Sequence, residues 1–180
     1  GNVSADANKW MARRYDPNVT ISIKNGGGIR SAIGVVNAVG GNVSLDPPAA
    51  NPLAGKLEGD ISQLDIENSL RFNNLLSTLT LNAANLRTIL EHGVAASGPG
   101  QTQGRFPQIS GVRFSYNETL PANARILNAV VTDSAGVTLD TLVQNGSIYG
   151  DPSRTFRVVT LNFLAGRGDG YPFNRLGTAR

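Results

Sequence analysis

The alternation of apolar and polar positions predicts the first strand of the chain. Over residues 19–24 every second residue is apolar, which is the period of a half-buried β-strand. The strand runs directly into Asn25-Gly26-Gly27-Gly28-Ile29-Arg30, where three consecutive glycines remove every Cβ. Glycine accepts positive φ angles and lets a ligand or another backbone approach closely. We therefore expect a tight turn here, and the successive amide groups of such a turn are able to form an anion-binding concavity.

Arg30, directly after these glycines, has two interpretations from the residues alone. Its planar guanidinium suits phosphate or paired hydroxyl groups. The alternative is a surface arginine beside an ordinary turn, and the residues leave both open. The segment is not a phosphate loop of the nucleoside-triphosphatase type, because no Gly-Lys-Ser/Thr follows the spacer.

Helices and strands are mixed along the rest of the chain. Three segments have apolar positions at helical spacing and a capping residue, namely residues 4–14, 62–68 and 82–93. Strand-like segments follow the first helix and recur later, at residues 75–81, 112–116, 125–132, 137–139 and 156–161. The turn at residues 133–136 joins two of them as an antiparallel hairpin, so the predicted fold class is α+β.

One long tract interrupts this pattern. Residues 40–55 are rich in proline and glycine and show no clear periodicity. We therefore expect an exposed, mobile surface insertion there.

Length and composition narrow the class of protein. A chain of 180 residues is most simply one domain, covering residues 1–180. It has no run of about 18 apolar residues, so we expect no membrane span. The scattered basic residues and the net charge of +3 give no basic stripe, so nucleic acid is not an expected partner. The chain has no cysteine, which excludes thiolate metal sites and fits an exported bacterial protein. Its abrupt start, without a signal peptide, suggests the middle of a longer protein.

The single histidine, His92, limits the chemistry. A dinuclear phosphatase centre needs several His and Asp ligands, and one histidine cannot supply them. His92 precedes Gly93 at a predicted helix end, where a polar or cationic residue is common. We expect His92 to be structural, and we expect no catalytic residue and no metal ligand on this chain.

Two glycine-rich strand ends, NGGGIR and NFLAGRGDGY, flank a loop that contains Phe72. In this order and spacing the chain resembles, over nearly its whole length, the C-terminal domain of the 5′-nucleotidase family of metallophosphatases. The family includes UDP-sugar hydrolases and 2′,3′-cyclic phosphodiesterases. The resemblance implies a four-layer α/β/β/α domain that binds the substrate. It also implies a separate N-terminal domain, absent from this chain, that holds two divalent metal ions such as Zn or Mn and hydrolyses the phosphate ester.

The resemblance further implies that this chain alone is inactive as a phosphatase. Its partners are then a nucleotide or nucleoside and the intramolecular N-terminal domain, and its location is periplasmic, secreted or at the cell surface. In this family two phenylalanines stack on the base, an asparagine meets the base edge, an arginine faces phosphate or ribose, and an aspartate accepts from ribose hydroxyls. The matching positions here are Phe72, Phe163, Asn25, Arg30 and Asp169, together with Gly28 of the glycine turn. From the residues alone, the phenylalanines favour core packing and Asp169 an ordinary turn.

Three departures from the family pattern concern this site. Arg167 replaces the first glycine of the usual Gly-Gly-Asp-Gly, and Arg71 replaces the proline before Phe72. The tract at residues 40–55 makes the connection after NGGGIR much longer than in the family. An alternative class is a non-catalytic ligand-binding or adhesion module, because Arg167-Gly168-Asp169 is a tripeptide used in cell adhesion.

Overall fold

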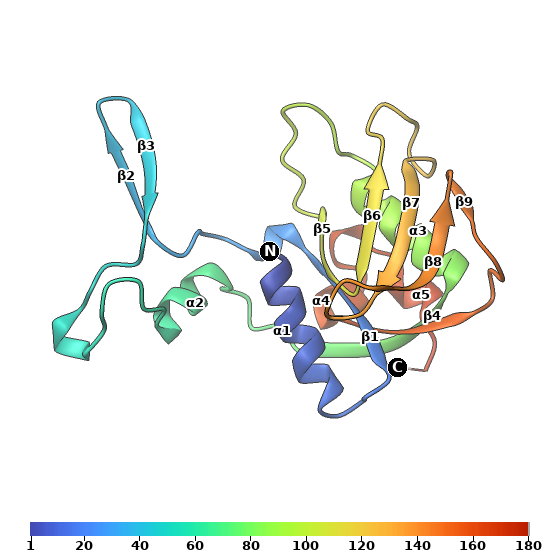
Figure 1. The fold of residues 1–180 in the computed structure, drawn as a ribbon, viewed down its shortest axis with the longest axis horizontal. Coiled ribbons are helices and arrows are strands. Elements are labelled where there is room, and N and C mark those ends of the chain that lie inside the picture. Colours follow the sequence, from blue (N-terminus) through green and yellow to red (C-terminus); the bar gives the residue numbers. More distant parts are fainter. Residues whose placement is uncertain (180) are drawn as a thin grey trace. The chain divides into compact units, whose positions relative to one another are not determined.

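The chain forms two compact units. The computed structural model describes residues 1–179, and the units are Gly1–Gly27 with Asn74–Arg180, and Gly28–Asn73 (Figure 1). The first unit contains most of the helices and strands, and the second consists of the segment that follows the glycine turn.

The first unit is built on a mixed four-stranded sheet in the order β4-β10-β1-β5. Its strands are β1 (Val19–Asn25), β4 (Leu76–Asn82), β5 (Pro107–Ser110) and β10 (Thr155–Leu161). The two central strands, β1 and β10, are parallel, and each has an antiparallel neighbour at the sheet edge. Thr160 ties the central pair further, because its Oγ1 donates to the Ile23 carbonyl oxygen at 2.7 Å.

A second four-stranded sheet is entirely antiparallel. It contains β6 (Val112–Tyr116), β7 (Ile126–Thr132), β8 (Thr138–Gln144) and β9 (Ser147–Ile148) in sequence order. Gly111 connects it to the first sheet with a φ of 83°. A Cβ at this position would lie 2.1 Å from the Thr20 carbonyl oxygen, so only glycine fits the crossing between the sheets.

The first sheet is covered on both faces. On one face, Ala12 of α1 (Asn2–Arg13) packs against Val19 and Val159. On the other face the main core joins the sheet to α3 (Ala83–Val94) and to the second sheet; its members include Ile21, Ile23, Leu79, Leu86, Leu90, Val131, Leu142 and Val158. Three short helices follow β10, namely α4 (Asn162–Ala165), η3 (Gly168–Gly170) and α5 (Phe173–Leu176).

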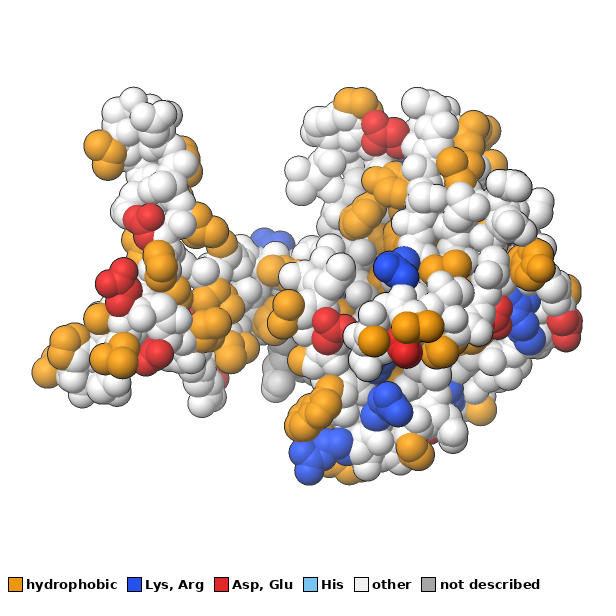
Figure 2. Space-filling model, in the orientation of Figure 1, with side chains coloured by type: hydrophobic (Ala, Val, Ile, Leu, Met, Phe, Trp, Pro, Cys, Tyr) orange, Lys and Arg blue, Asp and Glu red, His pale blue; other side chains and the backbone are white. Residues whose placement is uncertain are grey.

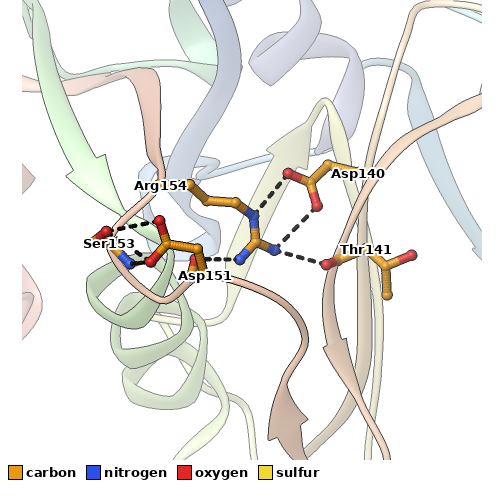
Figure 3. Close-up of polar contacts among 5 residues, drawn as sticks. All are labelled: Asp140, Thr141, Asp151, Ser153 and Arg154. Carbon is orange, nitrogen blue, oxygen red and sulfur yellow. Dashed lines mark hydrogen bonds and ion pairs between the residues drawn. The ribbon is translucent and has the colours of Figure 1, made fainter.

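An arginine fork links the two sheets of this unit. Arg154, just before β10, donates to both carboxylate oxygens of Asp140 on β8, at 2.9 and 3.1 Å (Figure 3). The same guanidinium donates to the carbonyl oxygens of Thr141 and Asp151, at 2.7 and 2.6 Å. A bidentate pair of this kind fixes orientation as well as distance, so it holds β8 and the start of β10 in a fixed relative position.

A buried carboxylate holds α3 against β7. Glu91 is only 2% exposed, and its two oxygens accept from the amides of Arg125 and Ile126, at 3.0 and 2.9 Å. Arg125 in turn donates from Nη1 to the carbonyl oxygens of Val94 and Ser97, at 2.8 and 2.7 Å, around the end of the helix. The helix and the strand are therefore locked by hydrogen bonds to charged groups, which are stronger than neutral ones.

Replacing Glu91 with alanine should destabilise the first unit by about 2–5 kcal/mol, because one buried and one partly buried amide lose their acceptor. Urea unfolding followed by circular dichroism measures this change. Glu58 is exposed in the second unit, and E58A is the control, expected within about 0.5 kcal/mol of the wild type. A loss below about 1 kcal/mol in E91A would show that the clamp is not needed for stability.

The second unit differs from the expectation for residues 40–55. That tract was predicted to be irregular, but β2 (Val35–Val39) and β3 (Asn42–Asp46) form an antiparallel hairpin. Gly40 and Gly41 have φ of 61° and 83°, and positive φ at both central residues is what a type I′ hairpin turn requires. The expectation of exposure agrees with the structure, since every residue of both strands is exposed, and Figure 2 shows hydrophobic side chains spread over the surface of this unit.

The rest of the second unit is a short 3-10 helix, η2 (Pro52–Ala54), and α2 (Gln63–Ser69). The predicted capping box is confirmed, with Ser62 and Asp65 exchanging hydrogen bonds. The side chain of Lys56, 2.8 Å away, and the Ser62 donors lower the pKa of Asp65 to about 2. Because the folded pKa lies below the ordinary value, this contribution to stability is present above about pH 4 and is lost as the pH falls toward 2.

Most elements predicted from the apolar pattern are confirmed, and so is the α+β class. One correction concerns Gly93, which was expected to end α3, whereas the helix continues to Val94. Gly93 is required by packing instead, because a Cβ there would lie 2.8 Å from the hydroxyl of Tyr171. No helix formed by residues 1–179 is long and apolar enough to cross a membrane.

Candidate functional site

The candidate site lies where the two central parallel strands end. Asn25 is the last residue of β1, and Asn162 and Phe163 follow directly after β10. Because parallel strands have their carboxyl ends at the same edge of a sheet, the two glycine-rich segments leave the sheet side by side. Ligands commonly bind at this edge in sheets that contain parallel strands.

Asn25 and Asp169, 144 residues apart in the chain, are in direct contact. The Asn25 Nδ2 donates to Asp169 Oδ2 at 2.6 Å, and Asn25 is 6% exposed. The other end of the same amide, Oδ1, is buried and accepts no hydrogen bond from any described residue. A buried acceptor without a donor is costly, so the Asn25 Oδ1 is a hydrogen-bonding group that the described residues leave unused.

The turn that carries Asp169 has an unusual backbone. Arg167 and Asp169 have φ of 85° and 52°, in the left-handed region that glycine prefers. Gly168 between them lies against the Phe163 ring, since a Cβ there would be 2.5 Å from ring carbons. The Arg167 side chain is exposed and makes no hydrogen bond or ion pair within residues 1–179.

His92 lies behind this turn and contacts it. Its Nε2 is 2.9 Å from the Asp169 carbonyl oxygen, and its ring meets the Tyr171 ring edge-on at 4.7 Å. Tyr171 is fully buried, its hydroxyl donates to the Arg105 carbonyl oxygen at 2.7 Å, and burial raises its pKa. The sequence placed His92 at a helix end, and nothing in the pattern indicated its contact with a residue 77 positions away.

The glycine turn after β1 uses its amides within the protein. The amides of Gly26 and Gly27 donate to the carbonyl oxygens of Phe106 and Gly104, at 2.8 and 2.6 Å. They are therefore not free to form an anion-binding concavity. The glycines are needed for close approach, because a Cβ at Gly27 would lie 3.0 Å from the Gly104 Cα.

The remaining predicted residues, Gly28, Arg30 and Phe72, belong to the second unit. Within it, the Arg30 amide donates to the Ser69 carbonyl oxygen at 2.8 Å. Phe72 is 57% exposed and Phe163, in the first unit, is 45% exposed, so neither ring belongs to the buried core. The structure thus brings Asn25, Phe163 and Asp169 together on one unit.

The first unit also has a separate cavity of about 750 Å³ beside α1. Trp10, Lys9 and Arg113 are among the residues that line it, and none of the predicted site residues does. Burial lowers the pKa of Lys9 there. Nothing in the sequence pattern indicated this cavity.

Comparison with known proteins identifies the family. Residues 1–175 match the family model described as the 5′-nucleotidase, C-terminal domain. The chain belongs to this family, as the sequence predicted. Among solved structures it is similar to a 5′-nucleotidase precursor from Thermus thermophilus, with a TM-score of 0.70 and 28% identity over 98% of this chain and 28% of that one.

The chain is also similar in sequence to several curated proteins. The trifunctional nucleotide phosphoesterase protein YfkN of Bacillus subtilis is 27% identical over 171 residues, covering 95% of this chain and 9% of that protein. A snake venom 5′-nucleotidase of Gloydius brevicauda is 28% identical, covering 92% and 23%. The cell wall protein Lmo0130 of Listeria monocytogenes is 25% identical, covering 95% and 18%. This chain therefore spans less than a third of each of these three proteins.

The described residues offer no cluster of metal-ligating side chains. Within residues 1–179, no group of three or more His, Cys, Asp or Glu side chains is placed to hold a metal ion.

Replacing Arg167 with glycine should stabilise the protein by roughly 0.5–1 kcal/mol. The left-handed backbone costs an L-residue about 1–2 kcal/mol, and the greater freedom of glycine in the unfolded chain offsets only part of that. R13G is the matched control, because Arg13 is exposed at the end of α1, where glycine should destabilise. Thermal unfolding of both variants checks the prediction, and equal shifts of the same sign would contradict it.

Proposed function

We propose that this chain is the substrate-binding domain of a two-domain, metal-dependent phosphohydrolase that acts on nucleotides or related phosphate esters. The observation that carries the proposal is the buried, unpartnered Oδ1 of Asn25, which lies beside the Asp169 carboxylate at the strand ends. Family membership and the exposed Phe163 ring support it.

Each predicted residue has a role in this proposal. Phe163 stacks on the base, since every base offers a π-face to an aromatic ring. Phe72, which belongs to the second unit, is the other stacking residue that the family resemblance implies. The Asn25 amide carries both a donor and an acceptor, and its Oδ1 accepts a hydrogen bond from an N–H group of the base. Asp169 accepts from ribose hydroxyls. Arg30, two residues after Gly28 of the glycine turn, binds phosphate or ribose.

The whole enzyme needs more than this chain. We propose that a separate N-terminal metallophosphatase domain supplies two divalent metal ions, which would activate the attacking water. The four-layer α/β/β/α arrangement and the interpretation of residues 40–55 as an insertion belong to the same proposal. Venom and cell-wall relatives support a secreted, periplasmic or cell-surface location.

The adhesion alternative is less well supported. An adhesion role would rest on the tripeptide alone, whereas the family model matches residues 1–175. The distinguishing observation is the sequence of any chain that precedes Gly1 in the full protein. Metal-binding Asp, His and Asn motifs there favour the phosphohydrolase, and their absence favours the binding module.

Replacing Phe163 or Phe72 with alanine should weaken adenosine binding by about 1–3 kcal/mol each, because one stacking face is lost. Isothermal titration calorimetry on the 180-residue chain measures the affinity. Both rings are exposed, so stability should fall by less than the roughly 3–5 kcal/mol typical of a core phenylalanine.

Tyr149 provides the control for this experiment, because it is 56% exposed and lies outside the proposed site. Y149A should leave adenosine affinity unchanged. If wild-type protein binds no nucleoside, or if all three variants bind equally well, the stacking roles are wrong.

The 180-residue chain should release no phosphate from AMP with any divalent metal added. The physical reason is that one histidine cannot build a dinuclear centre. A malachite-green assay with and without EDTA measures release. Metal-dependent release that the chelator blocks would place the catalytic site on this chain and contradict the proposal.

A further inference from the structure

The turn at Gly168–Gly170 is held at two points, one on the main chain and one on a side chain. We propose that His92 is a positioning residue that fixes Asp169 for ligand binding. This inference rests on the proposed function, in which Asp169 accepts from ribose hydroxyls. Asn25 holds the Asp169 carboxylate at 2.6 Å, and His92 holds the Asp169 carbonyl oxygen at 2.9 Å.

The direction of the His92 contact follows from chemistry. A carbonyl oxygen only accepts, so Nε2 of His92 must carry the hydrogen and donate it. Both the neutral Nε2–H tautomer and the imidazolium meet this requirement. The contact therefore does not depend on His92 becoming charged.

Asp169 needs such a hold because its backbone is strained. Its φ of 52° lies in the left-handed region, and strained residues persist only where the surroundings fix them. Within the turn, the amides of Gly170 and Tyr171 donate to the carbonyl oxygens of Arg167 and Gly168, at 3.0 and 3.1 Å. The next carbonyl, that of Asp169, is bonded from outside the turn by His92.

His92 is itself on a rigid support. It belongs to α3, and its neighbour Glu91 fastens that helix to β7. Its ring packs on the buried Tyr171. The turn also fits closely around it, because a Cβ at Gly170 would lie 3.2 Å from the His92 Cε1. A site residue held by a packed helix keeps its geometry better than one held by a loop alone.

A positioning role and a purely structural role predict different ligand selectivity. If His92 only supports the fold, its loss weakens every ligand alike. If it positions Asp169, its loss weakens a ligand that carries ribose and spares the free base, which relies on stacking. Adenosine and adenine are therefore the two probes, measured by calorimetry on the 180-residue chain.

Three variants sharpen the comparison. In H92Q the side-chain amide nitrogen has about the same reach as Nε2 and is able to donate, whereas in H92N it is too short. T88A is the control, because Thr88 is exposed one turn earlier on the same helix and bonds only within it. H92N should lower adenosine affinity about tenfold and leave adenine within about twofold, the loss expected for one hydrogen bond. H92Q and T88A should stay close to wild type with both probes.

A double substitution tests the link to Asp169 directly. Once D169A has removed the carboxylate, H92N should lower adenosine affinity no further, because interacting residues are not additive. The positioning role is overturned if H92N weakens adenine and adenosine by the same factor. It is equally overturned if H92N leaves adenosine unchanged, or if the two substitutions add.

Failure of the proposed function is separable from failure of this inference. If wild-type protein binds neither adenine nor adenosine, the nucleoside site is wrong. The NMR signal of the Gly170 amide nitrogen, which shares a peptide bond with the Asp169 carbonyl, then tests the role of His92 without any ligand. A shift of this signal in H92N but not in H92Q supports the hold, and an unchanged signal overturns it.

Discussion

The parallel pairing of β1 with β10 is the constraint on which the rest of the site depends. These strands are far apart in the sequence, yet their pairing at Ile23 and Thr160 brings their carboxyl ends to one edge of the sheet. An antiparallel pairing would send the two glycine-rich segments to opposite edges. With the parallel arrangement, Asn25 contacts Asp169, which is 144 positions away in the sequence. The buried Asn25 amide thereby meets the carboxylate of an exposed aspartate.

Stability and site geometry share the same elements. Glu91 and His92 are adjacent on α3; the first accepts from the amides of Arg125 and Ile126, and the second contacts the Asp169 carbonyl oxygen. The hydrogen bonds that lock the helix to β7 thus also fix the support of the turn. Strain at Asp169 is tolerated because the surrounding packing is already determined by the core.

Local sequence signals predicted a large part of this fold. The capping residues Ser62 and Asn82 mark the starts of two helices, and the alternation over residues 19–24 marks the central strand. These signals work because capping and strand period are set by neighbouring residues. The hairpin at residues 35–46 was missed, although the Gly40-Gly41 pair between its strands is a turn signal of the same local kind.

Contacts between residues that are far apart in the chain were harder to predict from the sequence. The resemblance to the family selected Asn25 and Asp169, but no pattern in the sequence revealed that they touch, or that His92 lies behind them. The sequence left open whether the glycine turn is an anion site or an ordinary turn, and the amides of Gly26 and Gly27 are used by the loop at Gly104 and Phe106. A turn motif shows where glycine is needed, and only the tertiary structure shows whether the neighbour is a ligand or another backbone.

In the proposed site, the buried Oδ1 of Asn25 accepts a hydrogen bond from a ligand at this edge of the sheet. A crystal structure of the 180-residue chain with adenosine tests it most directly. The account predicts a donor of the nucleoside about 3 Å from Asn25 Oδ1, with the base against the Phe163 ring. A nucleoside bound elsewhere, for example in the cavity beside Trp10, with Asn25 Oδ1 still without a donor, would contradict it.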